Sequence, residues 1–207
     1  VPFAHTVWYA TDKPTYTTAT TYSIGQEFDA SVPSDFFSGD MPEIALYNGA
    51  LTGTQKQKVD SYFAIKYGTT LSGGMLNYIS SQTGMIWNAT TNSGYKNNIT
   101  VIGRDDASAL NQKQSKSVNV SGLVAIWLVS IEGSNGDNAN EFASDQSFVA
   151  FGDNNGALLR STSGASSNLR LILWRVWRAQ VANQTDLLSL SVPDNSSLLT
   201  TKLPGES

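Results

Sequence analysis

Two short runs of oxygen-bearing side chains are the part of this sequence best suited to binding a metal ion. Asp105 and Asp106 are adjacent, and Asp153 and Asn154 begin a second turn that ends in a glycine. Calcium takes roughly six to eight oxygen ligands from carboxylates, amides and carbonyls, so both runs predict calcium as the cofactor. Neither run has the spacing of an EF-hand loop.

Ordinary turn chemistry is the alternative interpretation of the same residues. Asp, Asn and Gly favour turns through local hydrogen bonds and positive φ angles, without any metal. For residues 103–106 a second alternative exists, in which Arg104 pairs with a neighbouring aspartate and pins a loop. The sequence leaves these interpretations open.

Two tryptophans and an arginine near the C-terminal end are the candidate ligand-binding residues. Trp174 and Trp177 are three residues apart, so on a β-strand they face opposite sides. One of them can then be exposed beside Arg178 and stack on a sugar ring, whereas core packing is the alternative role for both.

The residue types needed for common enzyme mechanisms are missing or isolated. His5 is the only histidine and the chain has no cysteine, which argues against Ser-His-Asp, Cys-His and zinc mechanisms. Glycosidases need two carboxylates at a fixed separation, and Asp40 and Glu43 do not supply that pattern. The sequence therefore predicts a protein that is not an enzyme.

The composition excludes two classes of partner. The net charge is -4 and the pI about 4.9, without the basic stripe typical of nucleic-acid binding. No run approaches the roughly 18 apolar residues needed to cross a bilayer, so we expect no membrane insertion. Charged residues are only 14% of the chain, against about 25% in average soluble domains, and such a surface suits an extracellular protein.

One short helix is predicted near residues 52–67. Thr52 and Gln55 fit a capping box at its start, and Gly68 supplies the stop at its end. Three residues at helical spacing are expected to face a sheet: Val59, Tyr62 and Phe63.

The other apolar runs are short and are separated by turns rich in Gly and Asn. This pattern predicts an all-β fold, a β-sandwich of the jelly-roll or lectin-like kind. The expected strands are Glu43–Tyr47, Leu76–Ile79, Met85–Asn88, Ile99–Gly103, Leu123–Ile131, Ser147–Gly152, Leu169–Val181 and Leu187–Val192.

Several motifs, in order along the chain, carry a resemblance to known surface proteins. Residues 36–51, with Gly39-Asp40 and a strand ending in Tyr47-Asn48, resemble the closing strand of a laminin-G or concanavalin-A-like jelly roll. Residues 59–68 resemble the helix that follows it in large Bacteroidetes-type secreted surface adhesins, and residues 101–106, 110–117, 151–154 and 174–178 resemble the β unit after that helix.

The resemblance implies three parts. Residues 1–50 would be the C-terminal part of a laminin-G-like sandwich, 51–68 a connecting helix, and 69–207 a second sandwich unit, incomplete at its C-terminus. It also implies a protein secreted to the bacterial cell surface, often by type IX secretion.

The function expected from the resemblance is that of a non-catalytic adhesin domain that binds a glycan or a surface protein. Two alternatives are a structural spacer in a long surface protein, and a fragment of an exported protein bound to secretion machinery.

Overall fold

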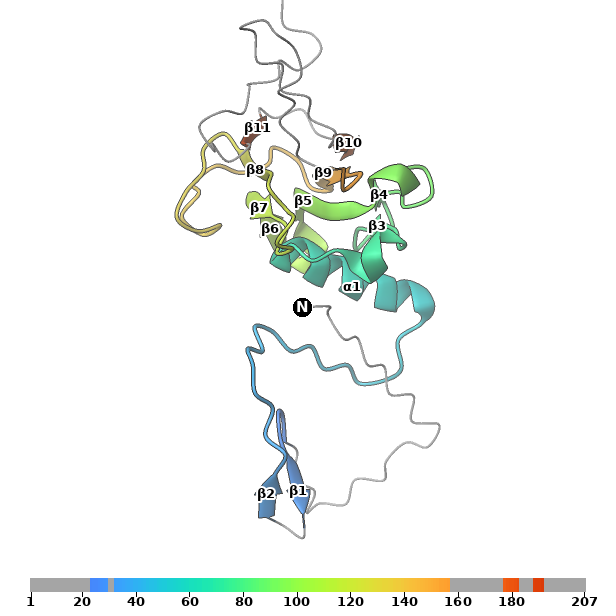
Figure 1. Cartoon of the computed structure of the whole chain (residues 1–207), viewed down its shortest axis with the longest axis vertical. Helices are drawn as coiled ribbons and strands as arrows, with labels where there is room; N and C mark the ends of the chain where they lie inside the picture. Colours follow the sequence, from blue (N-terminus) through green and yellow to red (C-terminus); the bar gives the residue numbers. More distant parts are fainter. Residues whose placement is uncertain (1–22, 30–31, 157–176, 183–187, 192–207) are drawn as a thin grey trace, which may run out of the picture. The chain divides into compact units, whose positions relative to one another are not determined.

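The structure is a computed structural model that describes residues 23–29, 32–156, 177–182 and 188–191. The chain divides into two compact units, residues 2–50 and residues 51–207. Within these residues most regular elements are strands in antiparallel sheets, accompanied by one α-helix (Figure 1). The prediction of an all-β class with a helix near residues 52–67 is confirmed, and the jelly-roll connection stays a prediction.

The described part of residues 2–50 contains one β-hairpin. Strands β1 (Glu27–Asp29) and β2 (Val32–Ser34) pair antiparallel. The strand expected at Glu43–Tyr47 is wrong: this segment is outside any strand, and Leu46 is almost wholly exposed. A short apolar run forms a strand only when another strand supplies its hydrogen bonds, and none does so here among the described residues.

Helix α1 (Gly53–Tyr67) begins and ends as predicted because its signals are local. The Thr52 side chain accepts a hydrogen bond from the Gln55 amide at 3.3 Å, and the Gln55 side chain accepts one from the Thr52 amide at 2.9 Å. Gly68 then ends the helix at φ 63°, a left-handed conformation that favours glycine.

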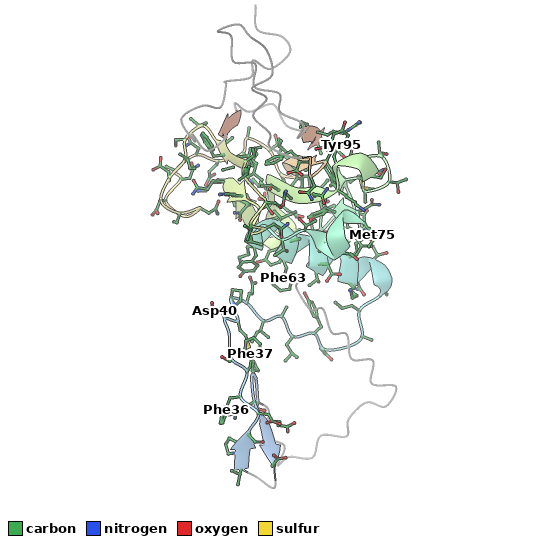
Figure 2. All side chains as sticks on the ribbon, in the orientation of Figure 1. Phe36, Phe37, Asp40, Phe63, Met75 and Tyr95 are labelled. Atoms are coloured by element: carbon green, nitrogen blue, oxygen red, sulfur yellow. The ribbon has the colours of Figure 1, made fainter. Side chains whose placement is uncertain are left out.

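The buried face of α1 differs in part from the expected one. Ser61, Ala64 and Ile65 are buried, whereas Tyr62 and Phe63 are half-buried. The Phe63 ring stacks on the Tyr67 ring at a centroid distance of 6.3 Å and meets the Tyr62 ring edge-on at 5.4 Å. Phe63 lies on a side of α1 that points away from β5 (Figure 2). Tyr62 packs against the apolar cluster that contains Ala64 and Ile65, so the expected contact face is confirmed for Tyr62, whereas its buried centre is formed by residues that were not expected there.

The strands described in residues 51–207 form three sheets. A four-stranded sheet has the order β10-β9-β5-β6, a three-stranded sheet the order β11-β8-β7, and β3 pairs with β4. Their bounds are β3 (Tyr78–Ile79), β4 (Met85–Trp87), β5 (Asn97–Asp105), β6 (Leu110–Gln112), β7 (Gln114–Lys116), β8 (Ala125–Leu128), β9 (Ser147–Asp153), β10 (Trp177–Ala182) and β11 (Leu188–Ser191). The short 3-10 turns are η1 (Leu71–Gly74), η2 (Ser93–Tyr95) and η3 (Asp106–Ser108).

The central strands β5 and β9 are covered on both faces. On one face Val101 and Ala150 belong to an apolar cluster with Ile65 of α1 and with β3 and β4. On the other face Ile102 and Val149 cluster with residues of β8. The strand pair is therefore the middle layer of this unit, with α1 on one side and β8 on the other (Figure 1).

Two glycines permit this close packing. A Cβ on Gly103 would lie 2.1 Å from a ring carbon of Phe148, and one on Gly152 would lie 2.2 Å from the Tyr95 carbonyl oxygen. The Trp87 ring is 3.2 Å from the same position on Gly152. Larger residues at 103 or 152 would force the strands apart.

Candidate functional site

The two predicted acid turns lie at opposite ends of the β5–β9 pair. Asn97 at the start of β5 pairs with Asp153, whereas Asp105 is the last residue of β5. Eight residues of strand span about 26 Å, so the two turns cannot bind one ion together. Each end is therefore a separate candidate site.

Asn98 is the centre of the first site, which we call the Asn98 network: Asn98, Asn119, Ser121 and Asp153. The β5–β9 register shifts between Asn97 and Thr100, and Asn98 has a φ of 52°. Asparagine tolerates this left-handed conformation better than most residues. The irregularity lets Asn98, which is only 3% exposed, interact with both β9 and the loop 117–122.

The Asn98 carboxamide makes four hydrogen bonds. Its Nδ2 donates to Asp153 Oδ2 at 2.8 Å and to the Ser121 carbonyl at 3.3 Å. Its Oδ1 accepts from Ser121 Oγ at 3.0 Å and from Asn119 Nδ2 at 3.2 Å. A carboxamide has no further capacity, so this buried amide is fully satisfied.

The turn at Asp153 and Asn154 is organised by the same kind of contact. Asp153 is 1% exposed, and its second oxygen accepts a hydrogen bond from the Asn155 amide at 2.7 Å. Asn154 Oδ1 accepts one from the Gly156 amide at 3.0 Å. N–H groups therefore point at the oxygens that would bind calcium, which favours the turn interpretation at this end.

The second site is the Arg104 cluster: Ser81, Arg104, Asp105, Asp106 and Asp145. Asp105 is buried, and its two oxygens accept hydrogen bonds from the Ser81 amide at 2.7 Å and the Ser81 hydroxyl at 2.5 Å. Arg104 contacts both oxygens of Asp106, at 2.7 and 2.9 Å. The arginine–aspartate pair offered as an alternative to a metal site is confirmed.

Asp145 links this cluster to the loop before β9. Its Oδ1 accepts hydrogen bonds from the backbone amides of Asp106 and Gln146, both at 2.8 Å. The Asp106 amide, helped by Gln146 and by the positive charge of Arg104, holds the pKa of Asp145 below its usual value. Hydrogen bonds to the ionised form have this effect because they stabilise the carboxylate.

The guanidinium also holds a loop directly. Arg104 Nη1 donates to the Phe142 carbonyl at 3.0 Å, and the Asp106 side chain raises the pKa of Arg104. Among the residues that the structure describes, no three acidic or imidazole side chains converge where a metal could lie. Hydrogen bonds of this cluster therefore connect β5 to the turn 80–84 and to the loop 141–147.

The predicted ligand-binding residues fall near the first site. Trp177 begins β10 and pairs with Asp153, and Arg178 is exposed opposite Gly152. The structure therefore brings the backbone of Trp177 beside the Asp153 turn. Trp174 lies outside the described residues, as does the part of the expected strand 169–181 that precedes Trp177.

Loop 117–122 is held in place yet exposes apolar side chains. The Val118 amide donates to the Gly68 carbonyl at 3.0 Å, and Asn119 belongs to the Asn98 network. Val118 is 65% exposed and Val120 is fully exposed. A fixed loop that presents apolar side chains to solvent is suited to contact a partner.

Sequence reasoning missed Asn98, Ser81, Asn119 and Asp145. The pair Asn97-Asn98 at the start of an apolar strand was a usable signal, because asparagine favours irregular backbone. Asp145 carries no comparable signal, since its main partner is 39 residues away in sequence.

Comparison with known proteins gives one match. A family model for a domain of unknown function (DUF8202) matches residues 55–204. No curated protein and no solved structure matches the chain. No helix among the described residues is long and apolar enough to cross a membrane.

Proposed function

Because the chain belongs to the family of domains of unknown function DUF8202, we propose its function from its own geometry. We propose that it is a non-catalytic module of a secreted or cell-surface adhesin that binds a glycan or a surface protein. The observation that carries this proposal is loop 117–122, which the Asn98 network holds in place and which exposes Val118 and Val120.

The non-catalytic part of the proposal is supported by what the acids do. Asp105, Asp106, Asp145 and Asp153 all accept hydrogen bonds from groups that fix turns or loops. Carboxylates held in this way are suited to orient loops rather than to exchange protons with a substrate.

Residues 23–50 support the proposal that residues 1–50 are the end of a laminin-G-like sandwich. None of the described side chains in this segment is buried. Its exposed large apolar residues are Ile24, Val32, Phe36, Phe37, Met41, Ile44, Leu46 and Tyr47, of which Phe36 and Phe37 are labelled in Figure 2. So many exposed apolar side chains in a short segment are suited to being covered by another β structure, because a lone hairpin is marginally stable.

A spacer in a long surface protein is the second candidate function. The Asn98 network and the Arg104 cluster favour it, because hydrogen bonds at both ends of β5 would stiffen a spacer without any ligand. The proposals of export to the bacterial surface, by type IX secretion, and of contact with secretion machinery come from the sequence resemblance. The weakly charged composition agrees with them.

The experiment that tests the binding proposal is a screen of the full chain against a glycan array and a panel of surface proteins. For a protein ligand we expect Val118→Ser/Val120→Ser to abolish the signal. The matched control is Val129→Ser/Ile131→Ser, which removes two exposed β-branched apolar side chains, 53% and 56% exposed, from another loop.

For a glycan ligand the informative variant is Arg178→Ala, with Lys116→Ala as control, because both remove an exposed cation from a strand. Loss in Arg178→Ala alone supports a glycan site beside β10. An array and a panel without any signal would refute the binding module and favour the spacer.

A further inference from the structure

The chain contains three Asn-Gly pairs, which are the sequences most prone to spontaneous deamidation. They are Asn48-Gly49, Asn135-Gly136 and Asn155-Gly156. In this reaction the backbone nitrogen of the glycine attacks the side-chain carbonyl carbon of the asparagine. The reaction therefore needs a free glycine N–H and a carboxamide that can rotate onto it.

Asn135 fails this requirement because its carboxamide is held on both sides. Its Oδ1 accepts hydrogen bonds from the backbone amides of Lys113 and Gln114 at 2.6 and 3.2 Å. Its Nδ2 donates to the Asn111 carbonyl at 2.8 Å. Rotation onto Gly136 would break all three hydrogen bonds.

Asn155 fails it because the attacking nitrogen is occupied. The Gly156 amide donates to Asn154 Oδ1 at 3.0 Å. The Asn155 amide donates to the buried Asp153 at 2.7 Å, so the backbone of this turn is fixed. Attack by Gly156 would require the turn to open.

Asn48 meets the requirement. It lies outside any helix or strand and is exposed, as is Gly49. A Cβ on Gly49 would meet no atom within 4 Å, so nothing obstructs the backbone there. Among the described residues no hydrogen bond holds the Asn48 carboxamide or the Gly49 amide.

We propose that Asn48 is a site of spontaneous deamidation and that the folded protein protects Asn135 and Asn155. The Gly49 nitrogen bonds to the Asn48 side-chain carbon, the bond to Nδ2 breaks, and ammonia leaves with the proton that Gly49 gives up. Water then opens the resulting succinimide, which yields isoaspartate or aspartate at position 48.

The product changes the charge and the backbone of a particular segment. Between Lys13 and Lys56 the only charged residues are acids: Glu27, Asp29, Asp35, Asp40 and Glu43. Conversion of Asn48 adds another negative charge to this run, and isoaspartate also lengthens the backbone by one carbon. Both changes fall two residues before the boundary between the two units.

Tryptic peptide mapping of the full chain, aged at mildly alkaline pH, tests this proposal cleanly. Asn48 is the only asparagine in residues 1–56, and trypsin does not cleave between Lys13 and Pro14, so one peptide reports on it alone. We expect that peptide to gain the mass change of NH₂ replaced by OH, and the peptide 117–160 to stay unchanged at Asn135 and Asn155.

Two controls separate structure from sequence. Asn48→Gln should abolish the change in the first peptide, and ageing in urea should bring all three Asn-Gly pairs to similar rates. The proposal is overturned if Asn135 or Asn155 deamidates as fast as Asn48 in the folded chain, or if Asn48 stays intact while the urea sample reacts.

Discussion

The substitution Asn98→Asp tests the Asn98 network most directly. Asn98 Nδ2 donates to Asp153 Oδ2 at 2.8 Å, and the two residues are 3% and 1% exposed. The variant replaces this donor by an oxygen, so two carboxylates face each other where water has little access. The backbone is barely disturbed because aspartate also tolerates the left-handed φ of 52°.

The expected cost at neutral pH can be worked in two ways. If both carboxylates stay ionised about 4 Å apart, their repulsion is about 4 kcal/mol at an effective dielectric constant of about 20. If one takes up a proton, holding it at pH 7 costs about 1.4 kcal/mol for each of the roughly three pH units above the usual aspartate pKa, again about 4 kcal/mol. We therefore expect the free energy of unfolding to fall by about 4 kcal/mol at pH 7.

The sign of the pH dependence of stability follows from the proton that the two carboxylates share in the folded variant. In the folded variant the carboxylate pair holds a proton that the unfolded chain releases, so the pKa of the pair is raised by folding. Stability relative to the wild type should then decrease as pH rises, by about 1.4 kcal/mol per pH unit between about pH 4.5 and pH 7. Near pH 4.5 most of the deficit should be gone.

Urea unfolding at several pH values, followed by tryptophan fluorescence, measures this difference. Asn119→Asp introduces the same charge at the exposed neighbour of Asn98, and we expect less than about 1 kcal/mol from it. Asn98→Gly removes the amide without adding charge, so its cost of about 1–3 kcal/mol should vary with pH much less than the cost of Asn98→Asp. A pH-independent loss in Asn98→Asp, or a loss no larger than that of Asn119→Asp, would refute the reasoning.

Three further outcomes are expected. Tyr78 Oη accepts a hydrogen bond from the Leu71 amide at 2.9 Å, so Tyr78→Phe should cost about 1–3 kcal/mol in urea unfolding. Burial also raises the pKa of Tyr78, so wild-type stability should fall as pH rises past about 10, where the unfolded chain ionises first, and Tyr78→Phe should lack this decline. Gly103→Ala places a Cβ 2.1 Å from the Phe148 ring, and this overpacking should destabilise the fold by about 1–3 kcal/mol or more and lower the melting temperature. In the control Gly94→Ala the new Cβ meets no atom within 4 Å, so the melting temperature should change little. Removing calcium with a chelator should leave the melting temperature unchanged, because N–H groups already face the oxygens of both predicted turns; a clear drop would restore the calcium interpretation.

The helix was predictable because its determinants are adjacent in sequence. Thr52, Gln55 and Gly68 are within one element, so the capping pattern alone gives both ends. The contact face was not predictable in the same way. Which side of a helix is buried depends on what lies opposite, and the β5–β9 layer selects Ala64 and Ile65.

The strands show the same division between local and distant determinants. The apolar runs around β5, β8 and β9 were predicted, since both faces of β5 and β9 are buried. Strands β6 and β7 were missed because Asn111, Gln112, Gln114 and Lys116 carry no apolar alternation. These strands exist because Leu110–Gln112 pairs with the end of β5 and Gln114–Lys116 pairs with β8.

The candidate sites were predictable only where partners are close in sequence. Arg104 and Asp106 are two residues apart, and their pairing was anticipated as one interpretation. The contact between Asn98 and Asp153 spans 55 residues. Nothing in the local pattern indicates it, because it depends on the shifted register of two strands that meet only after folding.

The burial of β5 and β9 on both faces restricts where relatives of this domain can diverge. A strand with one solvent-exposed face tolerates substitution at about half of its residues, but β5 and β9 have almost no exposed positions. Insertions and new surface chemistry must then accumulate in the connections at either end of the pair. Differences in partner preference among family members should therefore be sought in residues 80–84, 117–122 and 129–146 rather than in the sheet.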